Sequence, residues 1–243
     1  MRALFYKEIR SFLSSVIGYT FILIFLITSG LFHWVISDTT NLLEGSEADM
    51  IPFFNLSPYI FLILIPAITM RSIAEERRSG TIELLFTRPI SDLSILLAKY
   101  LAGVCLVAIA LLPTLIFYYS IYSLSLDPAK FDHGATITSY LGLLLLGAVF
   151  VAIGLFASSI TSSQIVAFIL AMFLCWIFYQ GLDLLGSFNL MGGFDFILQY
   201  IGIIYHYDSI KRGVIDSSDI VYFLTVIITF IFASLTVIKS IKN

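Results

Sequence analysis

Few residues of this sequence could carry out bond chemistry, and none falls into a catalytic spacing. The chain has no GxxxxGK[ST] segment and no Gly-Lys pair, so it cannot bind ATP through a phosphate loop of that kind. The HExxH and GxSxG spacings are also absent. Cys105 and Cys175 lie in long apolar runs, where a free cysteine acts as a small hydrophobe. The sequence therefore predicts no catalytic residue and no cofactor.

The remaining candidates for metal or proton chemistry are isolated from one another. His33, His133 and His206 fall in separate segments near the predicted outer boundary, and we expect them to be solvated rather than to share a metal. Lys99 and Asp183 lie near the ends of apolar runs, where water or lipid headgroups would reach them. A proton relay needs a deeply buried ionisable group, and the sequence predicts neither such a relay nor a metal site.

The segment from Arg71 to Lys99 is the one polar stretch with an ordered pattern. Residues 71–78 can extend the preceding apolar run as a charged helix, and Gly80 permits a sharp turn. Glu83 then falls at the third position of a short helix, where a carboxylate meets free N–H groups and the helix dipole.

That short helix would have one apolar face and a defined end. Ile82, Leu85 and Phe86 share the face, at spacings of three and four residues. Pro89 stops the helix, and Ser91 with Asp92 caps the next one. Because a helix of two turns has little stability alone, we expect this face to dock on another protein. The alternative is an ordinary positively charged loop that needs no partner.

The composition of the flanking sequence is that of a membrane protein. Apolar residues make up 59% of the chain and charged residues 12%, against about a half and about a quarter in soluble domains. A spanning helix needs about 20 apolar residues. The sequence thus predicts an all-α membrane protein with six transmembrane helices, at residues 16–36, 53–70, 93–124, 137–158, 165–185 and 220–238.

Basic residues predict the orientation of these spans. If the N-terminus is cytosolic, the inside segments hold 10 of the 13 lysines and arginines, leaving Lys130, Lys211 and Arg212 outside. With an even number of spans, both termini are then cytosolic. The inside set is Arg2, Lys7, Arg10, Arg71, Arg77, Arg78, Arg88, Lys99, Lys239 and Lys242.

Two further segments are amphipathic or apolar without being predicted to span. Residues 1–15 alternate apolar and basic side chains at helical spacing, which predicts an amphipathic helix in the cytosolic interface; an extended start of the first span is the alternative. The external stretch 186–219 is too apolar for a free loop, and its apolar side chains should be buried. Gly192 and Gly193 divide it into two pieces, which predicts a re-entrant or interfacial helix pair before the last span.

The cytosolic segment resembles a family signature. Residues 75–85, EERRSGTIELL, followed by RPIS at 88–91, resemble the cytosolic motif of ABC-2-type (type V) transporter permeases. The segment RGVID at 212–216, followed by Tyr222 and Phe223, is similar to the pattern before their last span. The six spans and the amphipathic N-terminus also match. Within the family the chain is most similar to permease subunits of gliding-motility-associated ABC transporters.

The resemblance implies a permease that does no chemistry itself. It implies a separate cytosolic ABC ATPase subunit, a second permease chain in a homo- or heterodimer, and a bacterial cytoplasmic membrane location; gliding-type systems also have an additional membrane subunit. Nucleic acid is not an expected partner. The ATPase-coupling residues would be Glu75, Glu76, Arg77, Gly80, Thr81, Ile82, Glu83, Leu84, Leu85, Phe86, Arg88 and Pro89.

Two functions fit this implication. The first is export of a substrate that the family does not fix, driven by the partner's ATP hydrolysis. The second is an ATP-driven mechanical transducer or membrane anchor for a motility or secretion assembly, in which nothing crosses the membrane.

Overall fold

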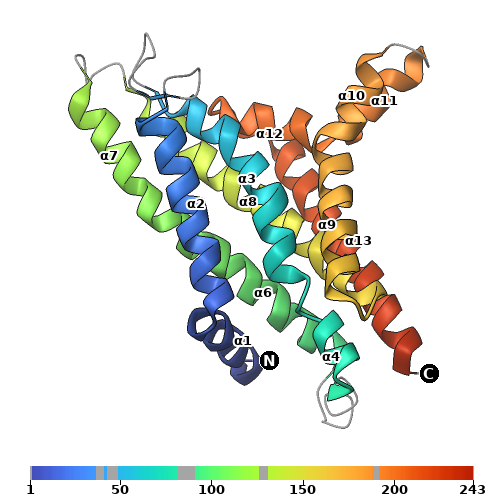
Figure 1. The fold of residues 1–243 in the computed structure, drawn as a ribbon. Coiled ribbons are helices and arrows are strands. Elements are labelled where there is room, and N and C mark those ends of the chain that lie inside the picture. The colour runs from blue at the N-terminus through green and yellow to red at the C-terminus, as the bar shows by residue number, and fades with distance from the viewer. Residues whose placement is uncertain are drawn as a thin grey trace.

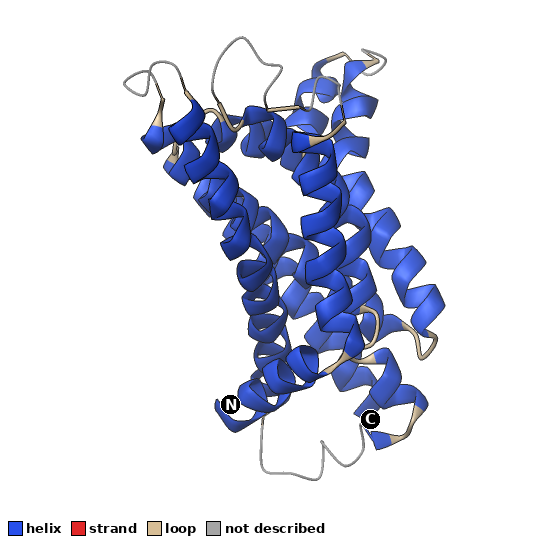
Figure 2. Ribbon diagram, turned by 60° about the vertical axis from the view of Figure 1, so that its left-hand side comes forward, coloured by secondary structure: helices blue, strands red, loops and turns tan. Residues whose placement is uncertain are grey.

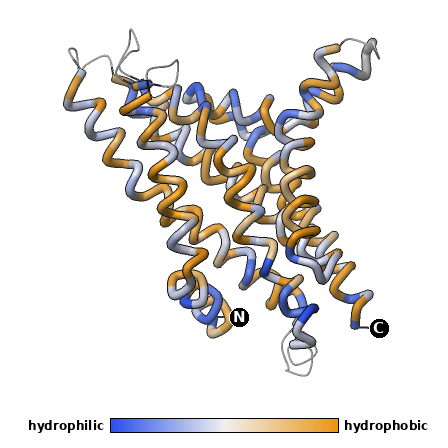
Figure 3. The backbone as a smooth tube through the Cα atoms, in the orientation of Figure 1, coloured by the Kyte–Doolittle hydropathy of each residue, from blue (hydrophilic) through white to orange (hydrophobic). Residues whose placement is uncertain are grey.

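The computed structural model describes residues 2–36, 41–42, 49–81, 91–125, 131–188 and 192–242, and every regular element in these ranges is helical (Figure 2). Six helices are long and apolar enough to cross a membrane, which confirms the predicted all-α fold with six spans. They are Val16–Trp34, Ile51–Arg78, Asp92–Leu124, His133–Ile160, Gln164–Ser187 and Ser217–Lys242. Figure 3 shows apolar residues along the middle of the bundle and polar residues gathered toward its ends.

The first span is α2 (Val16–Trp34), and the second is α3 (Ile51–Thr69) with a short continuation, α4 (Ala74–Arg78). The third consists of α6 (Asp92–Leu111), a 3₁₀ turn at Leu112–Thr114 and α7 (Leu115–Leu124). Pro113 explains the 3₁₀ turn, because its missing N–H interrupts the helical ladder there.

The fourth span, α8 (His133–Ile160), is the centre of the bundle. It contacts α3, α6, α9, α12 and α13, and 78% of its most apolar window is buried within the chain. Glycines permit the close approach: a Cβ at Gly154 would overlap the Thr69 side chain, and one at Gly147 would meet Val107. Small residues have this role in membrane helix pairs generally, because they bring backbones together.

The fifth span joins α9 (Gln164–Trp176) to a π-helical turn at Ile177–Gly181 and to α10 (Leu182–Ser187), and the sixth is α13 (Ser217–Lys242). In the first, fifth and sixth spans, which contain α2, α9 and α13, only 28% of the most apolar window of each is buried within this chain. These three spans therefore present most of their surface outward.

The predicted amphipathic helix is present as α1 (Arg2–Ser14). Its apolar residues Leu4, Phe5, Ile9, Phe12 and Leu13 are half-buried, whereas Arg2, Lys7 and Arg10 are exposed. The chain then turns into α2, where Ser15 caps the new helix by accepting the Gly18 N–H. A side chain at Gly18 would overlap the Phe12 carbonyl. Its depth in a membrane interface stays a prediction.

The segment before the last span forms α11 (Gly193–Ile201) and α12 (Ile203–Lys211). The backbone of Gly192 has a φ of 61°, which favours glycine. A break is therefore present at the predicted glycines, but it separates α10 from α11, whereas α11 and α12 divide at Gly202, which the sequence pattern did not single out. Whether these helices re-enter a bilayer stays a prediction. Among the described residues, α12 contributes Ile203, His206, Tyr207 and Ile210 to the buried interior.

The chain itself does not bury the apolar side chains of α11, so their expected burial in a bilayer stays a prediction. Phe188, Phe196, Ile197, Tyr200 and Ile201 are exposed, because α11 packs on α10 and α12 beyond the bundle (Figure 1). Leu190, Met191 and the Phe194 side chain lie outside the described residues.

The two ends of the bundle carry different elements. The N-terminus, the C-terminus and α4 lie at one end, while α11 and α12 lie at the other (Figure 1). The arrangement agrees with an even number of spans and brings the polar segment after α3 to the same end as α1.

Candidate functional site

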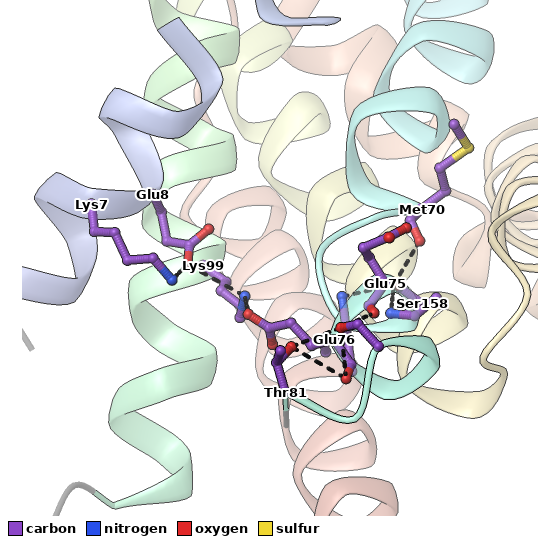
Figure 4. A network of polar contacts seen from close by, with 11 residues as sticks. Lys7, Glu8, Met70, Glu75, Glu76, Thr81, Lys99 and Ser158 are labelled. Atoms are coloured by element: carbon purple, nitrogen blue, oxygen red, sulfur yellow. Dashed lines mark hydrogen bonds and ion pairs between the residues drawn. The ribbon is translucent and has the colours of Figure 1, made fainter. Parts of the chain in front are cut away.

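The start of α4 is fixed to α8 by one buried hydroxyl. The Ser158 Oγ accepts the backbone N–H groups of Ile73 and Ala74 at 3.1 and 3.0 Å, and donates to the Met70 carbonyl at 3.0 Å. Ser158 is fully buried. Backbone groups at a helix boundary lack helical hydrogen-bond partners, and this hydroxyl is the partner of three such groups. The break between α3 and α4 is thus a fixed bend (Figure 4).

A second bond holds the far end of α4. The Arg77 Nη1 donates to the Ser159 carbonyl at 2.5 Å, at the C-terminal end of α8, where a positive charge complements the helix dipole. The helix then ends at Arg78, and the hydroxyl of the capping residue Ser79 donates to the Glu75 carbonyl. Gly80 follows with a φ of 70°, so the turn expected at this glycine is present.

A buried cation joins three helices at this end of the bundle. The Lys99 Nζ of α6 lies 2.7 Å from Glu76 Oε1 of α4 and 3.4 Å from Glu8 Oε1 of α1 (Figure 4). The Lys99 side chain is only 4% exposed. The expectation that water or headgroups reach it is therefore wrong. A buried ammonium requires paired carboxylates, and the packing of α1 against α6 supplies the second one.

The predicted coupling residues fall into two groups. Among those described, Glu76 and Arg77 face the bundle and are half-buried, whereas Glu75, Gly80 and Thr81 are exposed. Thr81 bonds to Ser79 Oγ and to the Glu76 carbonyl, at 2.9 and 3.5 Å. The remaining predicted residues lie outside the described residues: Ile82, Glu83, Leu84, Leu85, Phe86, Arg88 and Pro89.

The next helix begins as its sequence predicts. Ser91 caps α6, and its Oγ accepts the Ser94 N–H at 3.3 Å. Asp92 in the first turn lies 3.5 Å from Lys242 Nζ, which ties the end of α13 to the start of α6.

Sequence reasoning missed Glu8, Lys99 and Ser158. A lysine within an apolar run, with two glutamates predicted on the same membrane face, was a signal for the ion network. For Ser158 we find no sequence signal, because serines in spans mostly bond within their own helix.

At the opposite end, two histidines are buried rather than solvated. His33 and His206 are both 0% exposed, which corrects that expectation, while His133 is exposed. The His206 Nδ1 lies 2.7 Å from Asp219 Oδ1, and its Nε2 lies 2.9 Å from the Tyr200 carbonyl. Among the described residues, no three His, Cys, Asp or Glu side chains are placed to hold a metal.

Fold and sequence together define a six-span helical membrane protein with a polar element fixed at one end. The family model described as ABC-2 family transporter protein matches residues 3–241. The chain therefore belongs to the ABC-2 transporter family, as the resemblance implied, and membership implies partnership with an ABC ATPase and a membrane. The family is the membrane component of a transporter and is generally not catalytic. A comparison with curated proteins finds no match.

Proposed function

We propose that this permease couples to its ATPase subunit through α4 and the residues that follow it, as far as Pro89. The exposed side of this region, with Glu75 and Thr81, would receive the ATPase, while Glu76 and Arg77 transmit the movement inward. ATP hydrolysis by the partner would then switch the spans between inward and outward exposure and export a substrate.

The observation that carries this proposal is that buried hydrogen bonds and an ion pair attach α4 to the spans at both of its ends. Ser158 holds its first turn, Arg77 holds its last, and Lys99 links Glu76 to α1 and α6. A partner that displaces α4 must therefore move α3, α6 and α8 or break buried bonds. Such a connection favours transmission of force over a flexible tether.

The proposed location is a bacterial cytoplasmic membrane with both termini and α4 on the cytosolic side. The positive charge near this end supports the orientation, since Arg71, Arg77 and Arg78 belong to it together with the basic residues of α1. The shared position of both termini and α4 agrees with it (Figure 1).

A second permease chain, identical or homologous, is the proposed membrane partner. Its support is the outward-facing apolar surface of α2, α9 and α13. The second chain would cover part of this surface, and lipid would cover the rest. A link to gliding motility, with an additional membrane subunit that has a periplasmic domain, rests on the motif resemblance alone.

The coupling proposal is tested by charge reversal on the exposed side of α4. Glu75→Arg leaves the Ser158 and Lys99 contacts in place, and we expect it to reduce co-purification of the ATPase subunit in detergent. Glu47→Arg in the predicted external loop is the matched control. Equal association and ATP turnover in both variants would show that the ATPase docks elsewhere.

A second measurement separates export from mechanical transduction. ATP turnover by the complex in nanodiscs is compared across lipid and glycan extracts. Stimulation by one class of molecule supports a transported substrate. Stimulation that requires only an added membrane partner supports the transducer instead.

A further inference from the structure

A polar pocket lies at the end of the bundle opposite to both termini. It occupies about 520 Å³ between α10, α11, α12 and the start of α13. This volume is in the range of small-molecule sites. Its lining consists of Asp183, Tyr200, Ile204, Tyr205, His206, Asp208, Ser209, Arg212, Asp216, Ser218 and Asp219.

Acidic groups dominate this lining. Four aspartates face one arginine and His206. Lys211 Nζ pairs with Asp208 Oδ1 at 2.6 Å, and His206 pairs with Asp219, which leaves Asp183 and Asp216 against Arg212. The Ser218 N–H donates to Asp216 Oδ1 and lowers the pKa of that carboxyl, so it is ionised at neutral pH. The pocket therefore favours a positively charged group.

One buried carboxylate oxygen in the lining has no bond. Asp219 is 4% exposed, and its Oδ1 bonds to His206, but its Oδ2 has no hydrogen-bond partner among the described residues. Leaving a buried hydrogen-bond acceptor unpaired is costly. His206 cannot turn to it, because the Tyr200 carbonyl and the stacked Tyr222 ring, 3.9 Å away between centroids, fix the imidazole.

We propose that this pocket binds a ligand through a primary ammonium group, which donates an N–H to Asp219. The exposed rings of Tyr200 and Tyr205 offer faces on which a cation is attracted. The group belongs either to a soluble amine or to an aminophospholipid headgroup. For the lipid, Arg212 would meet the phosphate, and the exposed apolar face of α11 would lie beside the acyl chains. The proposal does not depend on how α4 meets the ATPase.

Binding is tested on the full chain with amines that differ in N–H content. Native mass spectrometry compares retention of phosphatidylethanolamine and phosphatidylcholine with equal acyl chains, and calorimetry compares ethanolamine with choline. We expect a preference of about tenfold for the primary amine, because the trimethylated group has no N–H to donate. Preference for the lipid alone identifies a headgroup site, and preference for ethanolamine alone identifies a soluble amine. Equal binding of primary and trimethylated forms, or binding of neither, would overturn the proposal.

Variants then locate the site. Asp219→Asn should weaken binding of the preferred amine by about tenfold, since a charge-assisted bond is lost. Because Asp219 also contacts buried His206, Asp183→Asn serves as a second variant in the same lining and should weaken binding as well. Asp92→Asn, at the other end of the bundle, is the matched control. Wild-type affinity in both a folded Asp183→Asn and a folded Asp219→Asn protein would place the ligand elsewhere; if Asp219→Asn does not fold, Asp183→Asn decides alone.

Discussion

The Tyr207 hydroxyl donates a 2.8 Å hydrogen bond to the carbonyl of Phe54, the group that Pro58 leaves without a helical donor. Tyr207 belongs to α12 and is fully buried, so this bond joins α12 to the second span. Proline is tolerated within membrane helices when a neighbour satisfies the freed carbonyl. One side chain thus connects the polar pocket region to the helix that leads into α4.

Tyr207→Phe should destabilise the protein by about 0.5–2 kcal/mol, because a buried carbonyl loses its donor. The measurement is the free energy of unfolding in mixed micelles. Pro58→Ala restores an N–H that can reach the Phe54 carbonyl, so the cost of Tyr207→Phe should shrink in the Pro58→Ala background. Identical costs in the two backgrounds would show that the hydroxyl does not serve this carbonyl.

Lys99→Met should destabilise the bundle by roughly 3 kcal/mol, because Glu8 and Glu76 keep their charges without the shared cation. Lys7→Met is the control, since Lys7 is largely exposed and lies 3.8 Å from Glu8. Thermal unfolding in detergent compares the two. A loss for Lys99→Met no larger than that for Lys7→Met would mean that the buried network contributes little.

Ser158→Ala should loosen α4 without unfolding the bundle, because two backbone N–H groups and one carbonyl lose their partner. We expect faster amide hydrogen exchange in residues 73–78. We also expect the permease to stimulate ATP turnover by its ATPase subunit more weakly. Ser159→Ala is a matched neighbour, since among the described residues the Ser159 hydroxyl bonds only to the Phe156 carbonyl of its own helix. Unchanged exchange in Ser158→Ala would contradict the fixed bend between α3 and α4.

Gly154→Ala should destabilise the contact between α8 and α3 by about 1–3 kcal/mol, because the new methyl group overlaps Thr69. Gly30→Ala in α2 has open space around its Cβ and should be neutral or slightly stabilising. Melting temperatures of the two variants test the difference. Comparable melting temperatures would indicate that α8 and α3 separate easily.

Reporter fusions test the orientation. Green fluorescent protein joined to either terminus should fluoresce, and alkaline phosphatase joined to either should be inactive, because both ends are proposed to be cytosolic. Alkaline phosphatase inserted into residues 43–48, within the predicted external loop, should be active. Active phosphatase at the termini would reverse the assignment of α4 to the cytosol.

The sequence alone determined which segments are apolar enough to span a membrane and where helices start and turns between them form. Apolar run length predicts the six spans, helical spacing predicts α1, and the Ser91 cap and the Gly80 turn follow from local rules. These features depend on residues near one another in the chain, so a single sequence contains the information.

The tertiary structure alone decided which polar groups meet. Lys99 near the start of a span and His206 in the segment before the last span were both expected to reach water or headgroups. Lys99 is instead buried and paired with Glu8 and Glu76 of two other helices, and His206 is buried and paired with Asp219 of the following helix. The bonds of Ser158 and Tyr207 likewise depend on how α8 and α12 are rotated against α3. Hydropathy and spacing do not encode that rotation, because it is set by the packing of side chains from several helices at once.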